Sequence, residues 1–285
     1  MHKNLLSVAF LVLLTTESVF AGLQVFPFRL LLTDKKRVTH LSLRYTGEKP
    51  AEYKLSTIFY RMKSDGAIDI VQDAKAEERS AMQLIQYSPH QVTLTPNVEQ
   101  VIRVRLTGPR NMADGEYRAH LLIEPLKETA ETTAAGKKAN EKMNMRLDAR
   151  IAVAIPVIFR HGKTEFSVNF SKFQVSQNAD KKPAFSVEMS SQGNAFPYGD
   201  LLVYYQPVGG ELQSVGIYRG VASFLSSRSF TFPLNIPEGS PLLKEITSST
   251  PVTKLKSGKL RLEFHEPQEN GKDGALVTSI DMPNS

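Results

Sequence analysis

Apolar and polar residues alternate in short runs along most of this chain, which is the period expected of half-buried β-strands. Leu41–Tyr45 and Ile102–Leu106 are clear examples, and turn-forming segments such as Thr46–Pro50 and Gly108–Pro109 separate the runs. Many short strands with frequent turns predict an all-β protein built from β-sandwiches. The one segment of helical composition, 74–81, is short, and we expect a surface turn or loop there.

The longest alternation runs from Met143 to Ile155, with apolar residues at the odd positions, and ends at Pro156. It exceeds the usual strand length of about five or six residues. The segment before it, 126–141, consists largely of Lys, Glu, Thr, Ala and Gly and cannot bury an apolar face, so we expect a long mobile loop.

A second strand-rich region follows from residue 160, with strand candidates at Phe185–Met189, Leu201–Tyr205 and Leu260–Phe264. No Pro-rich or Ser-rich tract of linker length precedes it. We therefore expect two domains, 22–159 and 160–285, joined by a short junction that holds them at a fixed angle.

The first 21 residues have the composition of a secretory signal peptide, with Lys3, an apolar run from Leu5 to Leu14, and Val19-Phe20-Ala21 before Gly22. The apolar run is shorter than the roughly 18 residues that a spanning helix needs. We expect the mature chain to begin near Gly22, to be soluble outside the cytoplasm and to have no stable membrane insertion.

Composition narrows the function classes. The chain has 41% hydrophobic and 22% charged residues, as a globular protein does, and no cysteine, which excludes a disulfide framework, a thiol nucleophile and a cysteine zinc site. The formal net charge is +6, from 35 Lys and Arg against 29 Asp and Glu. Because this excess is small and the chain carries an export signal, a nucleic-acid partner is not expected.

The search for catalytic motifs is negative. His40, His90, His120, His161 and His265 lie far apart, and none forms a helical pair of metal ligands. The chain has no nucleophile elbow, phosphate-binding glycine loop or dinucleotide fingerprint. We expect no metal and no cofactor. Two carboxylates from distant strands could still meet across a cleft, so a secreted β-sandwich glycosidase stays open as an alternative.

Several segments together resemble the periplasmic chaperones of the chaperone–usher pilus pathway. Ser88–Pro96 followed by Gln100–Val104 is similar to the central signature of that family. Further similar segments occur in the family's order: Val25–Arg29, Asp114–Arg118, Phe159–Arg160, Gly193–Leu201 and Ser257–Leu262. The resemblance covers nearly the whole mature chain and is best with the less typical branches that build thin or archaic-type fibres.

This resemblance implies two immunoglobulin-like domains that meet at an angle around a cleft. It also implies a function without catalysis: such a chaperone binds pilus or fimbrial subunits in the periplasm, stabilises them by donor-strand complementation and delivers them to an outer-membrane usher. A structural or adhesive pilus component is the other open alternative. Such a component should carry a free N-terminal donor extension, whereas this mature chain is expected to start directly in a strand at Leu23.

The resemblance gives the long alternation a role as the donor strand, at about 143–159. The residues expected to enter the subunit are Met145, Leu147, Ala149, Ile151 and Val153. The same side chains could instead face the chaperone's own core, as alternate residues of any strand do. Ala152 and Ala154 on the other face favour a strand with two usable faces.

The family also uses cationic side chains in the cleft to hold the terminal carboxylate of the subunit. Arg29 matches one of them, but the position of the usual lysine falls on Pro156, which has no charge, and Arg118 could supply the missing cation. Glu116 and Arg160 match members of an ion-pair network between the domains. Glu266 is the expected acidic partner from the second domain.

Overall fold

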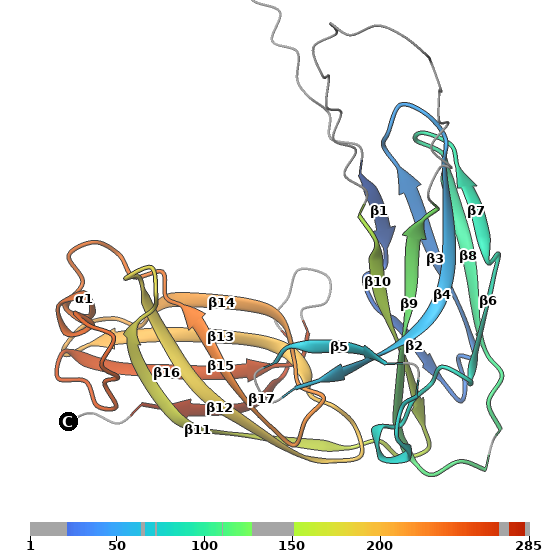
Figure 1. Ribbon diagram of the computed structural model, residues 1–285. Helices are drawn as coiled ribbons and strands as arrows, with labels where there is room; N and C mark the ends of the chain where they lie inside the picture. The colour runs from blue at the N-terminus through green and yellow to red at the C-terminus, as the bar shows by residue number, and fades with distance from the viewer. Residues whose placement is uncertain are drawn as a thin grey trace, which may run out of the picture.

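The structure, a computed structural model, describes residues 22–63, 66–71, 73–109, 111–126, 151–267 and 274–282. It consists almost entirely of strands arranged in two β-sandwich domains that meet at an angle like the arms of an L (Figure 1). The all-β prediction is therefore confirmed. The predicted signal peptide, 1–21, lies outside the described residues, and so does 127–150, which holds most of the predicted loop and the first part of the alternation.

The first domain contains two sheets that pack face to face. One has four strands in the order β1 (Leu23–Phe26), β3 (Val38–Tyr45), β8 (Glu99–Leu106) and β6 (Ile85–Ser88). The other has the order β2 (Leu30–Thr33), β10 (Val153–His161), β9 (Gly115–Pro125), β4 (Ala51–Met62) and β5 (Ile68–Val71), with β7 (Gln91–Leu94) paired to β4. A short 3-10 helix, η1 (Ala76–Glu78), lies in the segment where a surface turn was expected.

The second domain repeats the sandwich with different strands. Its three-stranded sheet has the order β11 (Phe166–Gln177), β12 (Pro183–Gly193) and β15 (Ser227–Pro233), and its four-stranded sheet the order β14 (Gln213–Ala222), β13 (Tyr198–Pro207), β16 (Gly258–His265) and β17 (Leu276–Asp281). A five-residue helix, α1 (Pro241–Glu245), lies at the far end. In the described residues no helix is long and apolar enough to cross a membrane.

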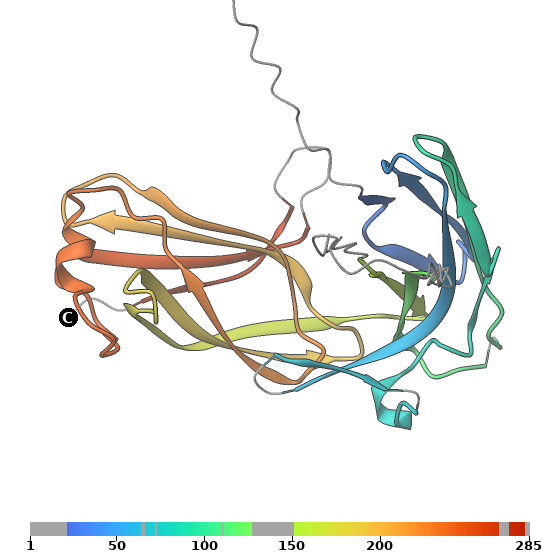
Figure 2. The same cartoon turned by 45° about the horizontal axis from the view of Figure 1, so that its top comes forward.

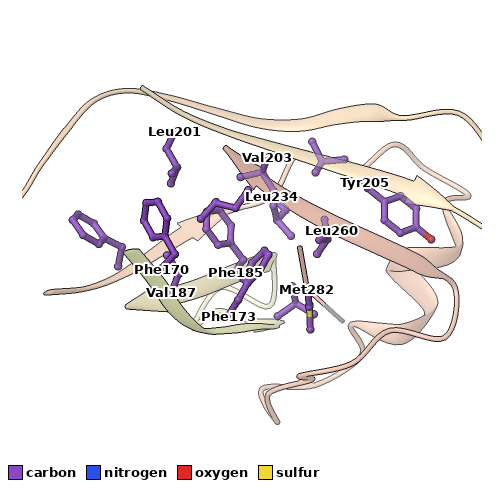
Figure 3. Packing of buried hydrophobic residues seen from close by; sticks show 14 of the residues in the cluster. Phe170, Phe173, Phe185, Val187, Leu201, Val203, Tyr205, Leu234, Leu260 and Met282 are labelled. Atoms are coloured by element: carbon purple, nitrogen blue, oxygen red, sulfur yellow. The ribbon is translucent and has the colours of Figure 1, made fainter. Parts of the chain in front are cut away.

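Each domain has its own apolar core, formed by the alternate residues of facing sheets. On β3, Leu41 and Leu43 are fully buried, while His40 and Arg44 face solvent. In the second domain the side chains of both sheets point inward between the layers (Figure 3), including Phe170, Phe185, Val203 and Leu260. Two separate cores mean that each domain can be stabilised by its own packing.

The first edge strand of the first domain changes sheet at Pro27. Before it, β1 pairs with β3; after it, β2 pairs in parallel with β10 in the opposite sheet. That parallel pairing covers only Val157–Arg160 of β10. The preceding part of the strand, Val153–Pro156, pairs with β9 on one side and with no described strand on the other.

The junction between the domains is short and tied down by hydrogen bonds. β10 ends at His161 and β11 begins at Phe166. The carboxylate of Asp34 accepts a bond from the backbone N–H of Gly162 (2.9 Å) and contacts the His161 ring (2.8 Å). The hairpin formed by β4 and β5 also lies beside the second domain, as both views show (Figure 2).

Leu43→Ala should lower the stability of the first domain by about 2 to 5 kcal/mol, because it leaves a cavity at a fully buried position. The neighbouring Arg44→Ala, on the exposed face of the same strand, should change it by less than about 0.5 kcal/mol. Urea unfolding of the mature chain measures both variants. Equal effects of the two variants would contradict the orientation of β3.

Candidate functional site

The cleft between the domains is built on the outer face of β9 and β10. Because side chains alternate along a strand, Ala119 and Leu121 enter the first-domain core while Glu116, Arg118 and His120 point to the other face. These three polar residues are only 1%, 3% and 5% exposed. The strand is thus buried on both faces, and its outer face is polar.

Glu116 and Arg160 stand opposite each other in the register of β9 and β10 and form an ion pair, with 2.9 Å between Arg160 Nε and Glu116 Oε2. The backbone N–H of Glu116 donates to the carbonyl oxygen of Asn194, in the second domain, at 2.8 Å. The predicted partner Glu266 is exposed, and its backbone N–H bonds to Ala275. Within the described residues Glu266 does not contact this pair, and the contact from the second domain is made by Asn194 instead.

Arg118 lies inside the junction. Its guanidinium is 4.3 Å from the ring centroids of Phe59, in the first domain, and Phe224, in the second, and 5.1 Å from that of Phe196. Burial lowers the pKa of Arg118 to about 10, against the opposing effect of Glu78 and Glu116, so the group stays protonated near neutral pH. A cation between rings of both domains can fix their relative orientation.

The hydrogen bonds of Arg118 also lie within this packing. The guanidinium donates to the carbonyl oxygens of Tyr60 at 3.2 Å and Glu78 at 3.3 Å, whereas Nε has no partner among the described residues. The guanidinium therefore does not open into the cleft. This placement argues against the predicted role of Arg118 as a carboxylate anchor.

An ion pair between Arg61 and Glu78 supports the packing around Arg118 on the first-domain side. Arg61 donates from Nε and Nη2 to the two carboxylate oxygens of Glu78, at 2.7 and 2.8 Å, which fastens η1 to β4. This bidentate contact lowers the pKa of Glu78 from its ordinary value to about 2. Since the carbonyl of Glu78 also accepts a bond from Arg118, the pair indirectly positions the interdomain cation.

Arg29, the other predicted anchor, lies between the sheet change at Pro27 and β2. Its guanidinium is 4.1 Å from the ring centroid of Tyr198, in the second domain. The side chain forms no hydrogen bond or ion pair with any residue of the described ranges. Burial lowers the pKa of Arg29, and nearby Glu116 opposes that effect. Arg29 is thus a half-buried cation whose N–H donors lack acceptors.

Around Arg29 the structure contains a cavity of about 190 Å³ between the domains. Its walls include Arg29, Glu116, His120, Pro156, Phe196 and Tyr198. Arg29 and Glu116 are the ionic side chains among these lining residues, and Glu116 is already paired with Arg160, so the charge of Arg29 can attract an anion into the cavity. A larger hollow of about 430 Å³ lies outside β1 and β3, but its only ionic side chains, Arg44 and Glu99, stand directly opposite each other.

In the described part of the long alternation, apolar residues after Val153 are buried and the one before it is exposed. Ile155, Val157 and Phe159 are buried in the core of the first domain. Val153 packs partly against this core, and Ile151, two residues earlier on the same face, is 70% exposed. Met145, Leu147 and Ala149 lie outside the described residues. The side chains near the strand's end thus serve the chain's own core, and Ile151 is accessible to a partner.

The sequence analysis did not identify His120, Asn194 and Tyr198 as site residues. His120 could have been found: antiparallel strands paired at Glu116 and Arg160 also bring His120 opposite Pro156. Asn194 and Tyr198 belong to the second domain, and no local pattern indicates that they meet the first. Within the described residues no group of His, Cys, Asp or Glu could hold a metal ion.

No protein-family model matches the sequence, and no curated protein matches it either. The chain is similar to several solved structures along most of its length. The Class 5 fimbriae chaperone CfaA is 13% identical, with 93% of this chain and 99% of that chain covered and a TM-score of 0.47. The CupB2 chaperone of Pseudomonas aeruginosa is 14% identical, with 91% and 99% covered and a TM-score of 0.40.

A structure of the Salmonella enterica SafA pilin in complex with the SafB chaperone contains a chain 13% identical to this one, with 91% of this chain and 95% of that chain covered and a TM-score of 0.42. The two-domain β-sandwich itself is evident from the sheets of this chain.

Glu78→Gln should lower the melting temperature by a few degrees near pH 6. Because the folded-state pKa of Glu78 is depressed, the stabilisation is present above its ordinary value of 4.5 and is lost as the pH falls through about 2. The difference between variant and wild type should therefore shrink between pH 5 and about 2. Thermal melts over this range measure it.

Asp69→Asn is a suitable control for that experiment, because Asp69 pairs with Lys63 while both side chains are about half exposed. An exposed pair of this kind contributes little. A pH-independent effect of Glu78→Gln, or an equal effect of Asp69→Asn, would contradict the assignment.

Proposed function

We propose that this protein is a periplasmic chaperone that binds pilus subunits, stabilises them by donor-strand complementation and delivers them to an outer-membrane usher. The observation that carries the proposal is strand β10, which at Val153–Pro156 pairs with a described strand on one side only and which borders a cleft containing Arg29, a cation without a bonding partner among the described residues. The sequence resemblance to such chaperones supports the same function, and the export-type residues 1–21 support the compartment.

The free edge of β10 suits a partner that lacks a strand. A sheet edge presents unpaired backbone N–H and C=O groups, and an extended segment can pair with them while alternate side chains fill pockets. Ile151, exposed next to this edge, is the first apolar side chain available to such a partner. The alternation continues toward the N-terminus through Ala149, Leu147 and Met145, which would extend the contact.

Arg29 suits the other end of the partner strand, the terminal carboxylate. A carboxylate can accept two bonds from one guanidinium, and such charge-assisted bonds are strong when partly shielded from water. The ring of Tyr198 against Arg29 restricts its orientation. We therefore keep Arg29 as the anchor and assign Arg118 to the domain junction.

The alternatives fit the cleft less well. A glycosidase requires two carboxyl groups across the bond that it cleaves. The described residues that line the cleft include one carboxylate, Glu116, and it is paired with Arg160. No described feature specifically favours a structural or adhesive pilus component.

Coexpression with pilus subunits from the same operon, followed by native mass spectrometry of periplasmic extracts, tests the function. We expect a complex of one chaperone and one subunit. A protein that stays alone with every candidate subunit, and instead hydrolyses a glycoside, would disprove the proposal.

Arg29→Ala should weaken subunit binding by about one to two powers of ten, the loss of one charge-assisted contact, while the chain stays folded. Arg44→Ala is the matched control, because Arg44 is exposed on the opposite sheet, and it should bind normally. Calorimetry with purified subunit measures both. Unchanged affinity in a folded Arg29→Ala variant would eliminate the anchor role.

Leu147→Asp and Ile151→Asp should abolish subunit binding and leave the melting temperature of the free protein nearly unchanged. Ile155→Asp, on the same face but 3% exposed, should instead unfold the first domain, because it buries an unpaired carboxylate. Melting curves and copurification distinguish these outcomes. A large fall in melting temperature for Ile151→Asp would show that this residue belongs to the core.

A further inference from the structure

His120 lines the interdomain cavity together with Arg29. It stands on β9 directly opposite Pro156 of β10, and both residues line the cavity that contains Arg29. Pro156 can neither carry a charge nor donate a backbone bond. His120, directly opposite on the neighbouring strand, offers a polar side chain beside this position.

The imidazole of His120 is held in place by packing and has no hydrogen-bond partner in the part of the chain that the structure describes. Its ring centroid lies 4.3 Å from that of Tyr60, on β4, and the residue is 5% exposed. Nδ1 is fully covered and bonds to none of the described groups. A neutral imidazole has one N–H donor and one acceptor nitrogen. Since a buried donor without a partner is rarer than such an acceptor, we assign the proton to Nε2.

The charged and titratable groups around His120 are Arg118 on β9, whose charge acts on it, Tyr60 on β4, whose ring it contacts, and Glu116, Arg29 and Tyr198, which line the same cavity. Burial, and secondarily the charge of Arg118, lowers the pKa of His120 to about 4. The free protein therefore carries a neutral imidazole near neutral pH. Because the imidazole is neutral, it does not repel the nearby cations, and a negatively charged ligand could enter beside it.

We propose that His120 is the second donor to the terminal carboxylate of the bound subunit, contributing the Nε2–H beside the guanidinium of Arg29. This inference rests on the proposed function, because it names a further contact of the same cleft. It is carried by the position of His120 opposite Pro156, by its imidazole, which bonds to none of the described residues, and by Arg29 on the wall of the same cavity.

The contact makes subunit capture dependent on pH. A carboxylate bound beside the imidazole favours its protonated form, so the pKa of His120 is higher in the complex than in the free protein. Protons then bind more readily to the complex, and affinity increases as the pH falls through the raised pKa toward the free-protein value of about 4. Arg29 alone gives no such dependence, because a guanidinium does not titrate in this range.

The first test uses N-acetylglycine as a minimal carboxylate, with N-acetylglycinamide as the matched control, and follows the histidine ring signals of the mature chain by NMR. His120→Gln identifies the signal. We expect the pKa of His120 to rise by about one unit or more with N-acetylglycine and to stay unchanged with the amide. An unchanged pKa up to the solubility limit of N-acetylglycine would overturn the inference.

The second test uses the copurified subunit and two variants. His120→Phe keeps the packing against Tyr60, and should bind about 3- to 30-fold more weakly and lose the increase in affinity between pH 7 and 4. His120→Gln keeps a donor, so it should retain more affinity but also lose the pH dependence. If His120 only packs, His120→Phe will bind with the same affinity and pH profile as wild type, which overturns the inference.

The two tests separate this inference from the proposed function. If no subunit copurifies but N-acetylglycine raises the pKa of His120, the carboxylate site stands and the chaperone function fails. If the subunit binds and neither variant alters its pH profile, the function stands and the role of His120 fails.

Discussion

The register between β9 and β10 is the constraint on which the cleft depends. It pairs Glu116 with Arg160 and, four residues farther along β9, His120 with Pro156. Because the odd-numbered side chains of both strands enter the first-domain core, a shift of one residue would turn those polar groups inward and expose the core. The core packing of the first domain therefore fixes the surface that the second domain covers, and with it the geometry of the cleft.

Removing the polar face of β9 from water costs desolvation free energy, and different contacts at the junction offset this cost for each side chain. An ion pair accounts for Glu116 and Arg160, but Arg118 is a buried cation that depends on aromatic rings and backbone carbonyls. A buried charge of this kind seldom stabilises a fold better than an apolar residue of similar size would. Its contacts with Phe59 and Phe224 come from different domains, which points to orientation as its main contribution.

Features that depend on the local pattern of residues could be predicted from the sequence. The alternation at Leu41–Tyr45 predicted a half-buried strand, and the lack of a linker tract near residue 160 predicted a short junction. Contacts between the domains could not be predicted in this way. Glu266 was chosen as the partner of Glu116 and Arg160 because it follows a strand, whereas the structure shows a backbone hydrogen bond between Glu116 and Asn194. Periodicity shows which face of a strand is buried, but it does not show whether a core, another domain or a client covers that face. For this reason periodicity alone could not assign Arg118 to the domain junction.

The sheet change at Pro27 links the two parts of the proposed binding site. It releases the edge of β10 before Val157 and, two residues later in the chain, brings Arg29 to the cleft. A terminal carboxylate held there, beside Pro156, would place the last residue of a partner strand at the cleft end of this edge. Ile151 is five residues from Pro156, or roughly 16 Å at about 3.3 Å per residue. The anchor would thus set which side chain of the partner meets Ile151, so that the charge selects the register and the apolar contacts supply the remaining affinity.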